Sequence, residues 1–135
     1  MLALLLLLQG ADGAGTYSGT AKQLDVHLPR IETQAKIDGV LDDAVWRQAA
    51  MLTHFSQYRP VDGRPAEDST EVLVWYASDA IYFGIRAFEQ HGTVVRATLA
   101  DRDNIDADDH VAILHDTYLD HRRATMFAVN PLGVQ

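Results

Sequence analysis

Apolar residues fall mostly in short runs or at every second position, and turn-forming residues separate these segments. This pattern is typical of an all-β domain, because successive residues of a strand face opposite sides of a sheet. No internal repeat is visible in the sequence. The predicted strands cover residues 24–28, 35–37, 53–58, 70–77, 81–89, 110–117 and 124–129.

A hairpin is the best-defined feature of this pattern. Residues 71–77 lead through Ser78-Asp79 into residues 80–87. The second of these strands alternates between an apolar face and a mixed one, which fits a strand with one buried and one partly exposed face. The first strand is apolar on both faces, so we expect it to lie centrally and to be covered on both sides.

One or two short helices interrupt the predicted strands. Asp42 is a favourable N-cap for a helix over residues 43–50, and acidic residues in a first turn suit the helix dipole. Thr93 is positioned to cap a second short helix that ends at Leu99.

The first residues resemble a secretory signal. The apolar run at residues 1–8 is shorter than the roughly 20 residues that span a bilayer, and small residues follow it. A buried N-terminal helix is the alternative. We expect a signal-peptide-like leader over residues 1–13, without the basic residues that normally precede the apolar run of such a signal. We expect a flexible leader over residues 14–22. The sandwich domain would then cover residues 23–135, with its C-terminal strands missing because the sequence stops after a strand and a turn.

Composition and charge narrow the functional classes. The 135 residues suit one domain, and 19 acidic against 11 basic residues give a formal net charge of −8. This balance argues against nucleic acid as a partner, since phosphate binding needs clustered Lys and Arg, and Arg122-Arg123 is the only adjacent basic pair. The lack of cysteine excludes disulfides, thiol catalysis and cysteine-ligated zinc.

The acidic stretch at residues 101–109 is the most conspicuous polar segment. Calcium takes about six to eight oxygen ligands, so closely spaced carboxylates are typical of its sites. The stretch is not an EF-hand, because Asp106 and Ala112 stand where that loop needs glycine and glutamate. The alternative is a solvated loop whose carboxylates cap neighbouring backbone ends.

Binding is a better expectation than catalysis, because the sequence has neither a nucleophile elbow nor a phosphate-cradling glycine loop. Aromatic rings can stack on the apolar faces of sugars. Trp46 is expected in the core, and core packing is also the alternative for Trp75. The candidate ligand-binding residues are Trp75, Tyr82, Arg86 and Tyr58.

Four segments together resemble family 9 carbohydrate-binding modules. Residues 37–46 are similar to the family's "I-D-G-x-L-D-E-x-x-W" opening, and residues 72–85 look like its paired strands. Residues 108–116 resemble its "D-D-x-V-x-I-x-x-D" strand. Residues 127–135 resemble the "F-x-V-N-P-x-G-x-Q" strand of one branch, in which the module precedes a probable outer-membrane C-terminal region in large exported bacterial proteins.

This resemblance implies a jelly-roll-like antiparallel β-sandwich with a role in polysaccharide use. It also implies structural calcium, a cofactor of some members. Asp38, Asp108 and Asp109 are the acidic positions inside matched segments, so a calcium-binding or turn-stabilising role is expected for them. Sugar-binding members hold a saccharide between two exposed tryptophans. This sequence has only two tryptophans, and Trp46 matches a structural position of the family.

We therefore expect a non-catalytic carbohydrate-binding-like module of an exported bacterial protein, periplasmic, outer-membrane-associated or extracellular, with a polysaccharide or oligosaccharide as partner. One alternative is the substrate-positioning part of a membrane-associated glycoside hydrolase. Another is a structural or protein-interaction sandwich that has lost sugar binding.

Overall fold

A computed structural model describes residues 14–90, 92, 94–99, 101–102 and 104–135. Within these residues the regular elements are six strands and one short 3-10 helix, so the predicted all-β class is confirmed. The apolar leader predicted at residues 1–13 lies outside the described residues.

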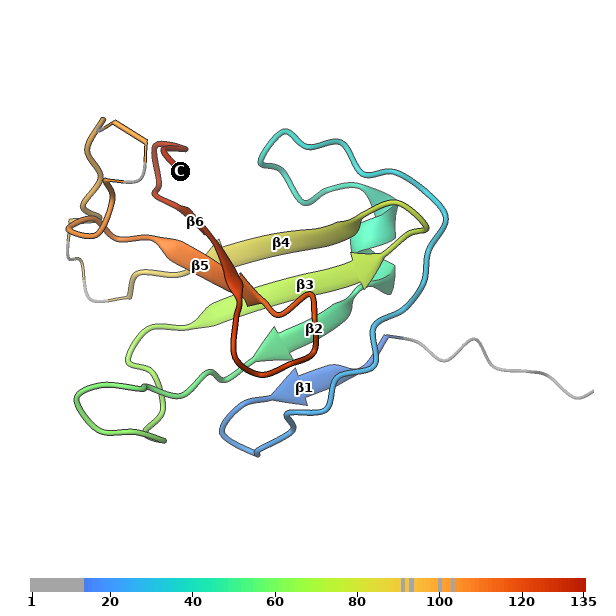
Figure 1. The fold of residues 1–135 in the computed structure, drawn as a ribbon, viewed down its shortest axis with the longest axis horizontal. Coiled ribbons are helices and arrows are strands. Elements are labelled where there is room, and N and C mark those ends of the chain that lie inside the picture. The colour runs from blue at the N-terminus through green and yellow to red at the C-terminus, as the bar shows by residue number, and fades with distance from the viewer. Residues whose placement is uncertain (1–13, 91, 93, 100, 103) are drawn as a thin grey trace, which may run out of the picture. The chain divides into compact units, whose positions relative to one another are not determined.

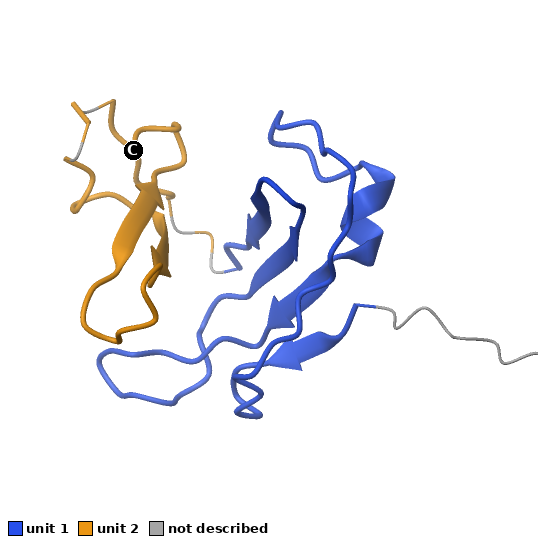
Figure 2. Ribbon diagram, turned by 45° about the vertical axis from the view of Figure 1, so that its right-hand side comes forward, with its two compact units in different colours: residues 1–91 blue, residues 92–135 orange. Residues whose placement is uncertain are grey.

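The chain forms two compact units, one within residues 1–91 and one within residues 92–135 (Figure 2). The sequence predicted a single domain over residues 23–135. The division follows from the strand pairing, because every strand ladder closes inside one unit or the other.

The first unit is built on a four-stranded sheet in the order β1-β2-β3-β4 (Figure 1). Its strands are β1 (Thr16–Ser18), β2 (Ala50–Thr53), β3 (Thr70–Tyr76) and β4 (Ile81–Ala87). β3 lies between β2 and β4 and is antiparallel to both, which matches its prediction as a central strand. β1 differs from the expected antiparallel arrangement, because it runs parallel to β2.

The predicted flexible leader at residues 14–22 contributes β1 to this sheet. The backbone N–H of Gly19 donates to Thr53 at 3.0 Å, and that of Thr20 donates to His54 at 2.9 Å. These bonds need only backbone groups, so the Gly- and Ser-rich composition that predicted flexibility gives no sign of them.

Three predicted strands differ from the structure. Residues 24–28 and 35–37 form no strand, and the strand expected at residues 53–58 is instead β2, which ends at Thr53. The next residue, His54, has a φ of 50°, in the left-handed region. A residue in that conformation interrupts the extended backbone of a strand, so β2 ends before it.

The helical predictions are only partly met. The first helix is a single 3-10 segment, η1 (Ala44–Gln48), rather than the helix expected over residues 43–50. Asp43 precedes it without a side-chain capping bond, because its carboxylate accepts the backbone N–H of Lys36 at 2.8 Å. No helix forms among the described residues of 92–99, and Thr93 lies outside them.

The core of the first unit is centred on Trp75, which is completely buried. Tyr82, its register partner on β4, stacks on it with ring centroids 3.9 Å apart and planes 9° apart. Trp46 from η1 meets the Trp75 ring edge-on at 6.2 Å and is 4% exposed. The expectation that Trp46 belongs to the core is confirmed. Val45, Ala49 and Leu73 complete the buried cluster.

Gly84 allows η1 to approach the sheet this closely. It lies opposite Leu73, on the same face as Trp75 and Tyr82. A Cβ atom at residue 84 would lie 2.9 Å from the Leu41 side chain and 3.0 Å from the Trp46 ring. Leu41 is flexible, but the Trp46 ring is fixed by its own packing, so an added methyl group forces the core apart.

The second unit holds an antiparallel hairpin of β5 (Val111–His115) and β6 (Thr125–Val129). Val111 pairs with Val129 at one end and His115 with Thr125 at the other. Both strands fall inside the predicted segments 110–117 and 124–129. The residues between them form the loop described below.

We predict that Gly84→Ala lowers the free energy of unfolding by about 1–3 kcal/mol, the usual cost of overpacking a core. Urea unfolding followed by tryptophan fluorescence measures it. Ala87→Ser, at an exposed position of the same strand, is the control and should change stability by less than about 0.5 kcal/mol. An unchanged midpoint for Gly84→Ala would contradict the close approach of Trp46.

Candidate functional site

The sequence-predicted ligand residues Trp75 and Tyr82 lie together, with Trp75 in the core and Tyr82 packed against it. Trp75 has no exposed surface, so it presents no ring face to a ligand. Tyr82 is partly buried, and one face of its ring is covered by Trp75. These two rings therefore stabilise the sheet, and a bound sugar could reach only the remaining surface of Tyr82.

Arg86 and Tyr58 are more accessible. Arg86 shares the Tyr82 face of β4 and pairs with Glu71, with 3.7 Å between Nη1 and Oε2. Tyr58 is 77% exposed on the loop after β2, and the Arg59 guanidinium carbon lies 5.7 Å from its ring centroid. Tyr58 is not on a strand, so it is separate from the residues of the sheet face.

The predicted metal residues Asp108 and Asp109 bind backbone groups of the second unit. Asp108 Oδ2 accepts hydrogen bonds from the backbone N–H and the hydroxyl of Thr98, both at 2.9 Å. Asp109 Oδ2 accepts the backbone N–H of Arg96 at 2.7 Å. Residues 96–98 thus donate to carboxylates rather than to a helical turn, which explains why the second predicted helix is absent from the described residues.

Asn130 completes this network and is 4% exposed. Its Nδ2 donates to the Thr98 carbonyl and to Asp108 Oδ2, both at 2.9 Å. Its Oδ1 accepts the backbone N–H groups of Leu132 at 3.0 Å and Val134 at 2.9 Å. The Thr98 backbone N–H, followed by Asn130, holds the pKa of Asp108 below its usual value. One side chain therefore joins three segments of the unit.

Asp38 belongs to the first unit and has its own partners there. It forms an ion pair with Lys36 at 2.7 Å and accepts the backbone N–H of Val40 at 3.0 Å. The hydrogen bond from Lys36 is the main reason that the pKa of Asp38 is lowered. Across the described residues, no three His, Asp or Glu side chains form a group suited to a metal ion. The calcium assignment stays a prediction.

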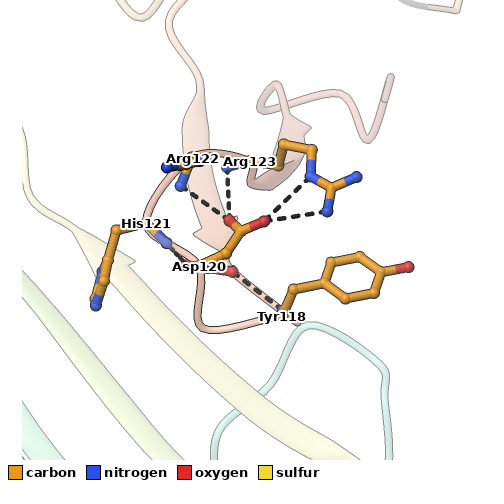
Figure 3. A network of polar contacts seen from close by, with 6 residues as sticks. Tyr118, Asp120, His121, Arg122 and Arg123 are labelled. Carbon is orange, nitrogen blue, oxygen red and sulfur yellow. Dashed lines mark hydrogen bonds and ion pairs between the residues drawn. The ribbon is translucent and has the colours of Figure 1, made fainter.

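The best-defined exposed site is the loop between β5 and β6, here called the 116–123 loop (Figure 3). The carboxylate of Asp116 binds two backbone N–H groups of this loop. Asp116 Oδ1 accepts the backbone N–H of Tyr118 at 3.0 Å, and Oδ2 accepts that of His121 at 2.8 Å. The second of these bonds is the main cause of a lowered pKa for Asp116.

Asp120 is the second aspartate that binds backbone N–H groups of the loop. Its Oδ1 accepts the backbone N–H groups of Arg122 at 2.9 Å and Arg123 at 3.2 Å. Its Oδ2 accepts Nε and Nη2 of Arg123 at 3.3 and 3.1 Å. The Arg122 backbone N–H, then the Arg123 side chain, lowers the pKa of Asp120. Both carboxylates of the loop are therefore held in the ionised form by donors of the loop itself.

The groups that the loop displays are aromatic, apolar and basic. Tyr118 is 73% exposed, and the Arg123 guanidinium carbon lies 4.9 Å from its ring centroid. Figure 3 shows these two side chains on the same side of the loop, whereas the His121 imidazole extends away from them. Leu119 is 80% exposed.

The backbone of this loop has an uncommon conformation. Leu119 and His121 have φ values of 53° and 55°, in the left-handed region. A bulky residue there is strained, and such strain persists only where surrounding bonds over-determine the backbone. The two carboxylates supply those bonds, so Tyr118 is presented by a defined loop.

Comparison with known proteins adds no family assignment, since the chain matches no protein-family model, no curated protein and no solved structure. The resemblance to family 9 carbohydrate-binding modules therefore stays a prediction. Among the described residues, no helix has the length and apolar character needed to cross a membrane.

Sequence reasoning did not select Tyr118 or its neighbours. A signal was present, because the only adjacent basic pair of the chain stands between two predicted strands, close to two aspartates. Aspartates in a turn commonly accept backbone N–H groups two residues ahead. That spacing marks an ordered loop, and an aromatic residue inside it is a candidate for exposure.

We predict that Asn130→Ala lowers the free energy of unfolding by at least about 2 kcal/mol, because buried backbone groups lose their partners. Chemical unfolding measured by circular dichroism gives this value, and amide exchange of β5 and β6 should rise with it. Asn104→Ala, at an exposed position of the same unit, should change stability by less than about 0.5 kcal/mol. Equal stability of the two variants would rule out the joining role of Asn130.

We also predict a pH dependence of the 116–123 loop. The pKa of Asp116 is lower in the folded chain than in the unfolded one, so its contribution to stability is present above about pH 4 and is lost as the pH falls further. The amide proton shifts of Tyr118 and His121, followed by NMR, should titrate with a midpoint below about 3.9. This titration should disappear in Asp116→Asn. A midpoint above that value would contradict the bonds to Asp116.

Proposed function

We propose that this chain is a non-catalytic carbohydrate-binding-like module that contacts a saccharide through the 116–123 loop. The observation that carries the proposal is the exposed ring of Tyr118, which lies beside Arg123 on a loop fixed by two carboxylates. An exposed ring held in place can stack on the apolar face of a sugar without first being ordered, which lowers the entropic cost of binding.

Hydrogen-bonding groups accompany the ring. A guanidinium has five N–H donors in a fixed plane, and only Nε and Nη2 of Arg123 point at Asp120. The Nη1 group has no partner among the described residues. Binding would combine stacking on Tyr118 with hydrogen bonds from Arg123 to sugar hydroxyls, and it requires no chemical step.

The proposed setting is an exported bacterial protein that binds or breaks down polysaccharide. Its support is the apolar run at residues 1–8 and the four segments that resemble family 9 modules. The alternative of a substrate-positioning part of a membrane-associated glycoside hydrolase uses the same loop and stays a prediction.

A second candidate is a structural or protein-interaction domain without a sugar site. It is favoured by the burial of both tryptophans, because Trp46 and Trp75 are 4% and 0% exposed. These are the only tryptophans of the chain, so no exposed pair remains to hold a sugar between two indole rings. The two candidates differ in one measurable property, which is saccharide binding by the isolated chain.

We predict that Tyr118→Ala weakens saccharide binding at least tenfold, about 1.4 kcal/mol, in calorimetric titrations with neutral and acidic oligosaccharides. Tyr118 is exposed, so the thermal unfolding midpoint should stay unchanged.

Tyr58→Ala is the matched control, because Tyr58 is equally exposed and also lies near an arginine. Its loop is closed by backbone hydrogen bonds, from the N–H of Gln57 to Arg64 and from the N–H of Gly63 to Gln57, rather than by carboxylates. Loss of binding in Tyr58→Ala alone would move the site to the sequence-predicted residue. No binding of any oligosaccharide by the folded wild-type chain would refute the proposed function and favour the structural candidate.

A further inference from the structure

In the 116–123 loop the basic side chains are more exposed than the acidic ones, which bears on the kind of saccharide that the loop would bind. Its acidic residues Asp116 and Asp120 are partly buried, and their oxygen atoms accept bonds from the loop. Its basic residues Arg122 and Arg123 are exposed. A ligand that approaches Tyr118 therefore meets the Arg123 guanidinium beside the ring, although the whole chain carries a formal charge of −8.

Arg123 is oriented before any ligand arrives. Its side chain is 71% exposed, whereas that of Asp120 is 28% exposed. The bonds from Nε and Nη2 to Asp120 fix the guanidinium plane near the Tyr118 ring. A fixed guanidinium binds carboxylate or sulfate oxygens through paired N–H groups, and it loses little rotamer freedom when it does so.

Arg122 supplies a second charge. Its backbone N–H binds Asp120, but its side chain has no ion-pair partner among the described residues. Charges more than about 8–10 Å away are largely screened at physiological salt, so the charges of the loop itself matter more to a bound group than those of the rest of the chain. The loop carboxylates already accept bonds from donors of the loop, whereas the Arg122 guanidinium and Nη1 of Arg123 are left for a ligand.

We propose that the saccharide bound by this loop is anionic, with a carboxylate or sulfate group on its ring contacted by Arg123 and Arg122. This inference rests on the proposed saccharide binding and deepens it. A neutral sugar would leave the Arg122 guanidinium and Nη1 of Arg123 to water, whereas an acidic sugar would contact both the exposed ring and these donors.

The test uses pairs of ligands that differ only in charge. Oligogalacturonate of defined length is compared by calorimetry with its fully methyl-esterified form, and a sulfated galacto-oligosaccharide is compared with its unsulfated form. We expect at least one acidic ligand to bind at least tenfold more tightly than its neutral partner, with affinity falling as salt is raised. The first pair detects recognition of a carboxylate and the second detects recognition of a sulfate.

Two variants assign this preference to the loop. Arg122→Gln and Arg123→Gln should each reduce the preference for the acidic form at least threefold. Arg47→Gln makes the same change in net charge at an exposed position on η1, and it should leave the preference unchanged.

Each outcome separates this inference from the proposed function. Equal affinity for charged and neutral partners would overturn the anionic inference and leave saccharide binding intact. A preference that survives in both loop variants would overturn the assignment to Arg122 and Arg123. If the folded chain binds none of the four ligands and also fails to bind a neutral oligosaccharide such as xylohexaose, both proposals are refuted.

Discussion

The burial of Trp75 is the interaction on which the first unit depends. It lies on the central strand, with Tyr82 stacked on its ring and Trp46 meeting it edge-on. Removing one such ring from water is worth on the order of 4–6 kcal/mol. The indole nitrogens of Trp46 and Trp75 are buried without a hydrogen-bond partner in the part of the chain described, which costs about 1–3 kcal/mol each. Ring packing therefore outweighs the unpaired N–H groups.

The rings of this core are covered, so the proposed saccharide contact is made by a loop. A ring that fills a sheet face stabilises the sheet, and for that reason it cannot also present a flat surface to a sugar. The two most exposed tyrosines of the chain, Tyr58 and Tyr118, lie on loops that follow strands. Such a division is common, because a rigid sheet can position loops whose sequence is free to serve binding.

The sequence predicts the hairpin of β3 and β4 well, because period-two alternation and an apolar central strand are properties of a few adjacent residues. It does not predict β1, whose ladder uses backbone groups with little apolar signal. The sequence also fails to predict the ordered structure of the 116–123 loop, for a related reason. Its shape depends on bonds from Asp116 and Asp120 to backbone N–H groups, and composition alone does not distinguish these carboxylates from solvated ones.

The setting of Asn130 has a chemical consequence for the lifetime of the second unit. Asparagine side chains age by deamidation when the backbone nitrogen of the next residue attacks the side-chain carbonyl. The residue after Asn130 is Pro131, whose nitrogen carries no hydrogen and cannot become that nucleophile. The amide oxygen is also held by Leu132 and Val134. Asn130, which joins three segments of the unit, is therefore protected from deamidation, the main spontaneous reaction of asparagine side chains.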